Sequence, residues 1–433
     1  MRGRWALLAF VVAACMLFWR FLPAGSHLCR VSPPPEGYRM PAEFEPHKAT
    51  WLSWPHTFEL RARKILAQMV DALQEGEEVH ILVNSESELE NAVETISKYC
   101  TLDNVFFHTI EHDDMWIRDY GPIFIDDGVS QACVDWPFDG WGGREPYERD
   151  DLVPRRIARI LGMRCYVFRG FVLEGGAIDV NGKGVCLTSD SLLNPKIRSP
   201  APTRQEVEQA LRKYLGIRRV IWLEGYLPGD IYTYGHVDSL ARFVNANTIV
   251  ASYQPDPNGP GYEVLERNYR ILLNAVDQDG NPFKVVRIPV SSDPKYPSSY
   301  VNFYIGNEVV LVPVYNDPRD EEALSIIRSL FPGRRVVALD CSWLTLMGGE
   351  IHCITLQQPK VGNSNGEKPD GLASHCLSLP TKLSAPVGKL QSLTQALSPR
   401  FQRFSRNRLP SHLHRASPPP LEHALNLCVS LAS

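Results

Sequence analysis

The sequence predicts an α/β fold built as a propeller-like ring of repeated units, and two observations indicate it. A helical pattern, a tight turn and a β-branched strand recur along the chain, and four of the helices begin near residues 150, 204, 262 and 320. These starts are about 54 to 58 residues apart, and each interval also holds a strand pair. A fixed period of this size is typical of stacked or radial repeats. We therefore expect about three strands and one helix per repeat rather than a doubly wound sheet.

The expected helices carry recognisable start and stop signals. Residues 60–75 follow the apolar period of an amphipathic helix. Thr203 and Glu206 form the pattern of a capping box, and Gly216 stands where that helix should end. Residues 87–100 predict an additional helix in the longer first interval.

The two ends of the chain differ from the patterned part between them. Basic residues precede an uncharged apolar run over residues 5–19, which is short for a bilayer span and typical of a signal-peptide core. We therefore expect residues 1–26 to be a signal peptide or signal anchor that directs the protein to the secretory pathway. Residues 361–433 lose hydrophobic periodicity and carry eight Lys/Arg against three Asp/Glu, which predicts a disordered tail. Residues 27–360 are the expected folded domain.

The composition is that of a globular protein and excludes several classes of function. The 433 residues are 22% charged and 44% hydrophobic, and the net charge of −4 gives no electrostatic case for nucleic-acid binding. Ten cysteines are too few for a disulfide scaffold, and none form a CxxC pair. Cys100, Cys133, Cys165 and Cys186 are expected to be buried core residues.

Two carboxylates lie at unusual points of the pattern. Asp119 stands between Arg118 and Tyr120, directly before a Gly-Pro turn and an apolar strand. Glu174 follows the apolar run 171–173, which we expect to be a buried strand, and precedes two glycines. A solvated turn explains either position, but both also suit a carboxylate at the mouth of a strand that faces a cation.

The remaining candidates are two histidines, an aspartate and a cysteine. His236 and Asp238 are two residues apart, so on a strand they share a face, as a catalytic dyad or as a polar edge. No second cluster with zinc-like spacing exists, so we expect no metal. Cys353 follows a Gly-Gly pair and is a soft nucleophile. His352 is expected to point away from it and to have a structural role.

Taken together, these side chains suit a cationic substrate. Paired carboxylates are poor neighbours for a thiolate that attacks a neutral carbonyl. A guanidinium, in contrast, is planar and pairs bidentately with carboxylates. The residues therefore favour guanidine chemistry over peptide hydrolysis, with Cys353 attacking the central carbon.

The motifs resemble those of the agmatine deiminase and bacterial-type (Porphyromonas-type) peptidylarginine deiminase family, in the guanidino-group-modifying (pentein) superfamily. Five stretches carry the resemblance: MPAEFEPHKATWLSWP (40–55), DDMWIRDYGPIFI (113–125), EGGAIDVNGKG (174–184), GHVDSLARF (235–243) and GGEIHCITLQQP (348–359). The resemblance covers about residues 36 to 360 in order. It implies a five-bladed α/β propeller of ββαβ-like pseudo-repeats, with residues 27–360 as the deiminase domain.

The resemblance also implies catalytic roles. Cys353 matches the nucleophile and His236 the general acid and base. Asp119 and Asp238 match the acids that hold the guanidinium, and Glu174 matches the acid that orients the histidine. The implied reaction forms a covalent Cys353 adduct with loss of ammonia, after which water hydrolyses it to a ureido product. No metal or organic cofactor is implied.

Substrate choice is where the sequence departs from the family. Trp116 matches an aromatic lining of the substrate tunnel. Tyr232 stands where agmatine-specific relatives have an aspartate that contacts the distal amine, and a tyrosine cannot neutralise an ammonium. Together with the secretory N-terminus, this favours arginine in peptides or proteins, with agmatine as the alternative. Glu350 replaces a more common asparagine, and an added acid there is expected to raise the pKa of the thiol.

Other classes stay open at this point. An amidinotransferase shares the fold and the nucleophile, whereas a cysteine protease would not need the paired acids. An inactive pentein scaffold is a further alternative, because the tail after Pro359 departs from the family pattern. The expected partner is the guanidino substrate, with no nucleic acid, membrane contact only through the N-terminal segment, and a homo-oligomer left open.

Overall fold

Five small β-sheets and the helices between their strands make up the part of the chain that the structure describes. The computed structural model describes residues 28–56, 61–198, 200–225, 229–293 and 298–362, all within the unit Met1–Gly366. The expected signal segment and nearly all of the expected tail lie outside these residues. Across the described ranges, no helix has the length and apolar character needed to cross a membrane.

Three consecutive sheets share one connection. A first strand runs antiparallel to a second, a helix follows, and a third strand lies parallel to the second on its other side. The units are β8 (Ile178–Val180), β9 (Val185–Ser189), α7 (Arg204–Leu215) and β10 (Arg219–Leu223); β11 (Ala241–Asn245), β12 (Thr248–Tyr253), α8 (Tyr262–Leu273) and β13 (Lys284–Pro289); and β14 (Tyr304–Ile305), β15 (Val309–Val314), α9 (Asp320–Leu330) and β16 (Arg335–Asp340).

The other two sheets use the same unit with one strand added. One contains β5 (Ile123–Asp126), β6 (Gln131–Asp135), α6 (Val153–Leu161) and β7 (Arg164–Val167), with β1 (Cys29–Arg30) parallel to β7 at the edge. The other contains β2 (His47–Ser53), α2 (Ala62–Leu73), β3 (Glu78–Val83), α3 (Glu86–Ile96) and β4 (Val105–Thr109). Its antiparallel strand is β17 (Leu356–Pro359), the last strand of the described chain, which pairs with β2 so that Leu356 faces Trp51. The last strand of the described chain therefore completes the sheet that contains β2.

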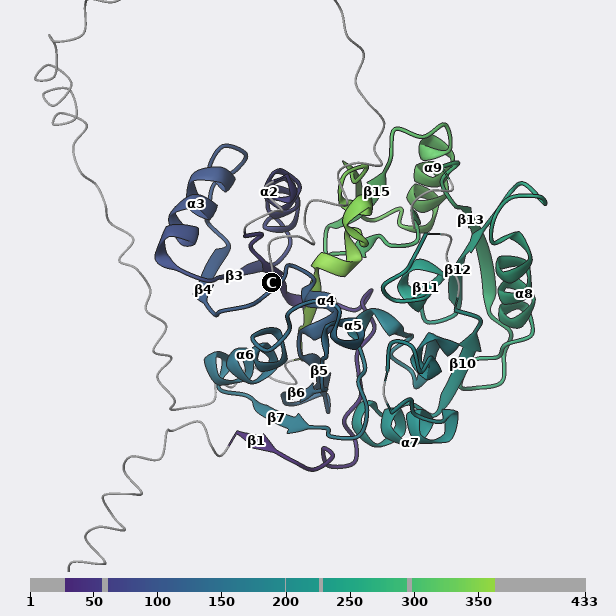
Figure 1. Ribbon diagram of the computed structural model, residues 1–433, viewed down its shortest axis with the longest axis horizontal. Coiled ribbons are helices and arrows are strands. Elements are labelled where there is room, and N and C mark those ends of the chain that lie inside the picture. The colour runs from purple at the N-terminus through teal and green to yellow at the C-terminus, as the bar shows by residue number, and fades with distance from the viewer. Residues whose placement is uncertain (1–27, 57–60, 199, 226–228, 294–297, 363–433) are drawn as a thin grey trace, which may run out of the picture. The chain divides into compact units, whose positions relative to one another are not determined.

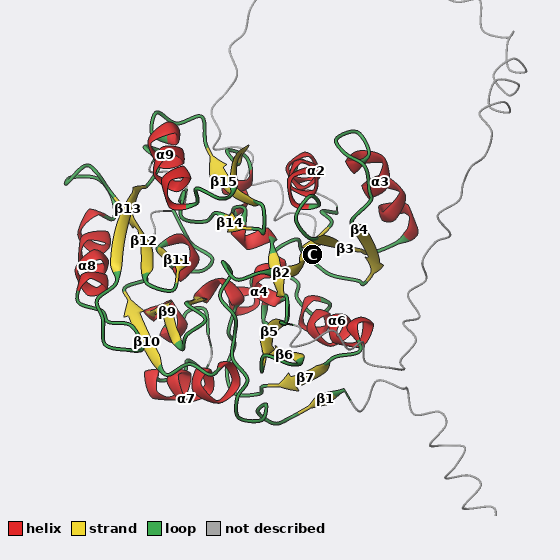
Figure 2. Cartoon of the chain, turned by 180° about the vertical axis from the view of Figure 1, so that it is seen from behind, coloured by secondary structure: helices red, strands yellow, loops and turns green. Residues whose placement is uncertain are grey.

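Buried apolar side chains lie between successive sheets. Leu187 of β9 belongs to the same cluster as Ile249 of β12, and Val250 of β12 to the same cluster as Val310 of β15. Leu311 of β15 joins a cluster with Trp51 of β2. These clusters therefore join the sheet of β9 to that of β12, the sheet of β12 to that of β15, and the sheet of β15 to that of β2. The helices α7, α8 and α9 lie on the outer side of their strands, whereas the short helices α4 (Ile117–Tyr120) and α5 (Gly140–Gly143) lie nearer the middle, as Figures 1 and 2 show from opposite sides.

The local signals read from the sequence explain where the helices begin and end. Helices α7, α8 and α9 begin at the predicted residues 204, 262 and 320, and a 3-10 turn at Asp150–Leu152 leads into α6. The Thr203 and Glu206 capping box is present, and Gly216 ends α7 with φ of +69°. The predicted α/β class is confirmed. The five-bladed propeller stays a prediction.

The cysteine expectation is only partly correct. Cys133, Cys165 and Cys186 are fully buried in the sheets. Cys100, however, is only partly buried, because it lies in the turn that follows α3.

Candidate active site

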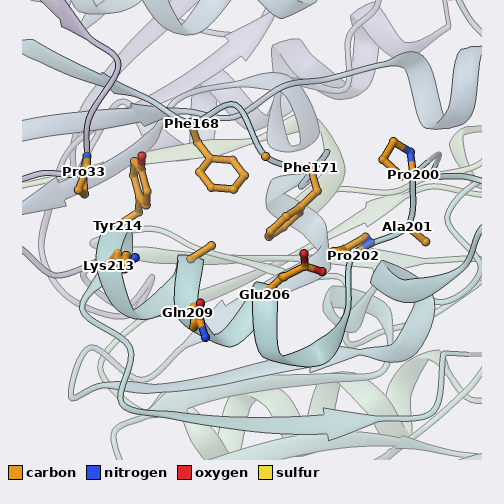
Figure 3. A pocket seen from close by; sticks show the side chains of 12 residues that line it. Pro33, Phe168, Phe171, Pro200, Ala201, Pro202, Glu206, Gln209, Lys213 and Tyr214 are labelled. Atoms are coloured by element: carbon orange, nitrogen blue, oxygen red, sulfur yellow. The ribbon is translucent and has the colours of Figure 1, made fainter.

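The described residues include two cavities of similar size, and the predicted site residues identify one of them. The first, of about 430 Å³, lies against α7 and is walled by Phe168, Phe171 and Tyr214 (Figure 3). It contains none of the predicted residues. The second, of about 410 Å³, is lined by four of them, Trp116, Asp119, Tyr232 and Cys353. The second cavity is therefore the candidate active site.

Cys353 lies in a 3-10 helix, η6 (His352–Ile354), directly before β17. Its Sγ lies 3.8 Å from Oδ2 of Asp238 and 3.4 Å from the side-chain amide nitrogen of Asn302. The side chain of His352 does not line the cavity, and its two ring nitrogens lie 2.8 Å from Oδ2 of Asp238 and 2.8 Å from Oε2 of Glu43. The short helix thus directs one side chain into the cavity and the preceding one into the protein.

The two glycines before the nucleophile allow aromatic rings to approach the backbone. A Cβ at Gly349 would lie 2.4 Å from Cζ3 of Trp116, so no larger residue fits there. Gly348 has φ of +100°, and a Cβ there would lie 3.1 Å from the ring of Tyr232. The predicted tunnel aromatic and the predicted specificity residue therefore both pack against the Gly348–Gly349 segment that leads to Cys353.

His236 lies between two carboxylates. Its Nδ1 is 3.7 Å from Oδ1 of Asp119, and its Nε2 is 3.8 Å from Oε2 of Glu174. Gly176 leaves the space in which these groups meet, since a Cβ there would lie 2.7 Å from Oδ1 of Asp119 and 2.8 Å from Nδ1 of His236. The second glycine of the EGG motif is thus required by the site itself.

The backbone around these residues differs from the sequence expectation. Asp119 does precede an apolar strand, but it lies in the helical turn α4. Glu174 precedes a 3-10 helix, η2 (Gly175–Ala177), and the run 171–173 is not a strand. His236 and Asp238 are not on a strand either, because a 3-10 helix, η4 (Val237–Ser239), begins after His236. The site is built from short turns that precede strands of four different sheets: Asp119 before β5, Glu174 before β8, His236 before β11 and Cys353 before β17.

Several buried polar atoms of the predicted site residues have no hydrogen-bond partner. Asp119 accepts hydrogen bonds from the Gly176 amide at 3.0 Å and from the Trp141 indole at 2.9 Å. In contrast, Oδ1 of Asp238, Oε1 of Glu174 and Nε2 of His236 are buried without a hydrogen bond to any described residue. Buried polar groups are nearly always paired in folded proteins. Unpaired buried atoms on three of the predicted site residues therefore point to a polar ligand.

The surroundings disfavour a thiolate in the free protein. Burial, and then the nearby carboxylates of Asp238 and Asp119, raise the pKa of Cys353 well above its usual range. Burial also raises the pKa of Asp238, but the bond to His352 together with the nearby His352, His236 and Arg242 charges outweighs burial and leaves that pKa below its ordinary value. The pKa of Glu174 is also lowered, because Arg198 and His236 together outweigh burial. A cation placed between the acids would offset their charge and favour the thiolate.

Glu350, the added acid beside the nucleophile, is fully buried. Its Oε1 accepts hydrogen bonds from the Tyr315 hydroxyl at 2.6 Å and from the Thr345 hydroxyl at 3.0 Å. Burial raises the pKa of Glu350 to about 8 in spite of these donors. The Glu350 charge raises the pKa of the Cys353 thiol, but less than burial, Asp238 and Asp119 do, and less than the hydrogen bond from the Glu350 backbone lowers it. Near neutral pH it is mostly protonated, so its effect there is weaker than that of a fixed charge.

The sequence reasoning missed a buried ionic network behind the site. Glu43 lies 2.8 Å from Nε2 of His352 and accepts hydrogen bonds from Arg118 at 3.1 Å and Arg242 at 2.7 Å. His352 in turn contacts Oδ2 of Asp238 at 2.8 Å. Glu43 lies in the first of the quoted motifs, but its partners are 75 to 309 residues away. No local pattern reveals such a network. Among the described residues, no group of three or more His, Cys, Asp or Glu side chains is placed to hold a metal ion.

Comparison with known proteins identifies the family. The sequence model of the Porphyromonas-type peptidyl-arginine deiminase family matches residues 39–359. The chain belongs to this family. The predicted resemblance is thereby confirmed, as is the expectation that the chain is a deiminase enzyme.

Relatives within this group have agmatine deiminase in their names. The agmatine deiminase of Ectopseudomonas mendocina is 35% identical over 76% of this chain and 97% of its own length. That of Medicago truncatula is 33% identical over 75% of this chain and 97% of its own length. The solved structure of the agmatine deiminase of Enterococcus faecalis has a TM-score of 0.70 at 29% identity, and the match covers 77% of this chain and 99% of that one. The mixed α/β fold is thus that of the pentein-fold deiminases.

Proposed function

We propose that this deiminase hydrolyses agmatine to N-carbamoylputrescine and ammonia, which the sequence placed second to peptidyl arginine. The charge of the cavity carries the proposal. Its charged lining residues in the described part of the chain are Asp113, Asp114, Asp119 and Glu145, with no lysine or arginine. Agmatine is a cation at both ends, whereas a C-terminal or free arginine brings a carboxylate that this lining would repel. The names of the relatives support the same substrate.

The guanidinium binds between Asp119 and Asp238 in this proposal. Oδ1 of Asp238 is buried and unpaired, and Oδ1 of Asp119 accepts only a backbone amide at 3.0 Å. A planar guanidinium offers donors to both acids at once. Trp116 lies in the same cavity, where its ring would pack on the alkyl chain.

The reaction begins once the bound cation offsets the acids. The Cys353 thiol then gives its proton to His236, and the sulfur forms a bond to the guanidinium carbon. The carbon–nitrogen bond breaks as His236 returns the proton to the departing ammonia. Water next adds to the adduct carbon, with one of its protons taken by His236. The carbon–sulfur bond then breaks as the hydroxyl group loses its proton to solvent and becomes the ureido carbonyl, and His236 returns its proton to the departing Cys353 sulfur. Glu174 is ionised and 3.8 Å from Nε2, so it stabilises the imidazolium that forms in each half-reaction.

Ammonia release by the full chain tests the substrate. Agmatine, free arginine and a peptide with C-terminal arginine are compared by kcat/KM, with Cys353→Ala as the inactive control. The highest kcat/KM is expected for agmatine. A higher value for the peptide would favour the protein-arginine alternative, and no ammonia from any of the three would contradict a guanidino hydrolase.

We propose further that the five sheets form the blades of a propeller. The repeated unit, the shared clusters between successive sheets and the pairing of β17 with β2 support this arrangement. It is a radial repetition in which strand ends converge on one site. Small-angle X-ray scattering of the full chain, fitted against closed and open arrangements of the repeats, tests this proposal.

We also propose that residues 1–26 direct the chain into the secretory pathway. The charge and length of the apolar run support a signal peptide or anchor. Expression with a C-terminal tag, followed by fractionation and N-terminal sequencing, distinguishes a secreted, an anchored and a non-secreted chain. Self-association stays a prediction that the same preparation can test by light scattering.

A further inference from the structure

One carboxylate at the mouth of the cavity has a defined position and no matching charge. Glu145 lies in the loop that follows α5, and its Oε1 is 3.5 Å from the hydroxyl of Tyr232. Burial, and then the neighbouring Glu145 charge, raise the pKa of Tyr232, so the phenol stays protonated and donates. Both residues line the same cavity as Cys353. The tyrosine therefore holds the carboxylate without neutralising it.

The other mouth carboxylates differ in their partners. Asp113 faces the guanidinium of Arg149 at 3.6 Å and accepts the Arg149 amide at 2.7 Å. Asp114 accepts the Met115 amide at 2.6 Å. Among the described residues, no side-chain nitrogen of a lysine or arginine forms an ion pair with the Glu145 carboxylate within 4.0 Å, although Arg144 precedes it in the chain. A ligand ammonium would supply the missing positive charge.

The loop that carries Glu145 also reaches the reacting end of the cavity. Trp141, four residues earlier, donates to Asp119 at 2.9 Å, and its ring meets that of Tyr232 edge-on at 6.3 Å. Trp141 has φ of +54°, a conformation that costs free energy in a non-glycine residue and is kept where the surroundings impose it. The segment from Trp141 to Glu145 thus sets the distance between Asp119, which is proposed to bind the guanidinium, and the Glu145 carboxylate at the cavity mouth.

Contacts of Arg144 fix this segment to the loop that carries Tyr232. Arg144 donates to the carbonyl of Ile231 and, at 3.3 Å, to the hydroxyl of Tyr234, and its guanidinium lies 5.3 Å from the centre of the Tyr234 ring. Tyr234 also has a positive φ of +57°. The loops that carry Glu145 and Tyr232 are therefore joined beside the cavity mouth.

We infer that Glu145 binds the terminal ammonium of the substrate, that Tyr232 is the positioning residue for Glu145, and that the Trp141–Glu145 segment sets the chain length of the guanidinoalkylamine accepted. The inference rests on the proposed function. It explains how a chain with tyrosine at position 232 can still recognise a substrate amine, because the negative charge comes from Glu145 in the loop that follows α5.

Paired substrates test this assignment. Ammonia release is measured for agmatine and for butylguanidine, which has the same chain without the amine, using wild type, Glu145→Gln, Tyr232→Phe and Glu148→Gln. Glu148 is an exposed acid three residues after Glu145 that does not line the cavity, so it is the matched control. Glu145→Gln is expected to lower the agmatine-to-butylguanidine ratio of kcat/KM by about 10- to 100-fold, mainly through KM, since a charge-assisted hydrogen bond is lost. Tyr232→Phe should lower the ratio less, and Glu148→Gln should leave it unchanged.

A charge reversal gives a second, independent measurement. Glu145→Lys should favour guanidinobutyrate, which has a carboxylate in place of the amine, over agmatine. An unchanged ratio in Glu145→Gln, or a loss that appears only in Asp114→Asn, would overturn the assignment. Failure of the proposed function looks different, because wild type itself would then release no ammonia from agmatine.

Discussion

At the scale of single residues, the chemistry of this site depends on carboxylates that oppose the nucleophile until a cation arrives. Asp238 and Asp119 both raise the pKa of the Cys353 thiol. In the proposed function the same two acids bind the guanidinium. Under that proposal, substrate binding and thiol activation are coupled through the same charges, and the free enzyme is protected from adventitious alkylation.

Asp238→Asn separates these two effects. Loss of the negative charge should lower the pKa of Cys353 in the free enzyme, because the thiolate then faces one carboxylate fewer. The rate of iodoacetamide labelling of Cys353 should accordingly rise at lower pH than in wild type, while kcat/KM for agmatine falls by about 100-fold or more. Labelling that shifts to higher pH would show that the acid does not act on the thiol through its charge.

Gly176 offers a steric test of the same point. Gly176→Ala would place a Cβ 2.7 Å from Oδ1 of Asp119 and 2.8 Å from Nδ1 of His236. We expect at least a 100-fold loss of kcat with a melting temperature only modestly lowered, since the clash is confined to the site. Gly333→Ala is the control, because a Cβ there meets no atom within 4 Å. Wild-type turnover in Gly176→Ala would mean that the histidine and the acid do not need this spacing.

At the scale of secondary-structure elements, the sequence predicted those features that depend on residues close together in the chain. Three helices begin at the expected residues because caps and apolar periods are local signals. The segments around Glu174 and His236 were expected to be strands but are short 3-10 turns, because their conformation follows from contacts between sheets. The site residues were found through chemical type and family motif. Glu43, Asn302 and Arg242 were missed because their partners are distant in sequence.

The capping box of α7 is predicted to contribute to stability and not to activity. Thr203→Ala removes the hydroxyl that accepts the Glu206 amide, and should lower the free energy of unfolding by about 1 kcal/mol. Urea denaturation measures that change, and kcat for agmatine should stay at the wild-type value. A change in kcat with little change in stability would indicate that α7, which borders the first cavity, communicates with the site.

At the scale of the whole domain, the buried network around Glu43 connects two strands of different sheets and two short helices behind the nucleophile. Its carboxylate contacts Arg118 of α4, Arg242 of β11, His352 of η6 and the Ile305 amide of β14. Such a group holds the turns that carry the site residues in a common position. Its loss should therefore affect both folding and catalysis.

Glu43→Gln is expected to lower the free energy of unfolding by about 3–5 kcal/mol, since it leaves buried cations without their partner. Burial raises the pKa of Glu43, but Arg242 and His352 outweigh burial and hold it well below its ordinary value of 4.5. Its stabilisation is therefore present above about pH 4.5 and is lost as the pH falls toward the lowered pKa. Urea denaturation at several pH values should show that wild type and Glu43→Gln converge in acid.

Glu45→Gln is the control for that comparison, because Glu45 pairs with Arg39 near the surface and should cost less than about 1 kcal/mol. Equal losses in the two variants would contradict a special role for the buried network.

The most direct measurement is the mass of the enzyme during turnover. Wild type mixed with agmatine, quenched in acid and digested, should yield a Cys353 peptide heavier by the mass of agmatine less ammonia, and Cys353→Ser should yield no such adduct and no ammonia. Ammonia released by Cys353→Ser at the wild-type rate, or an adduct on another residue, would contradict the account.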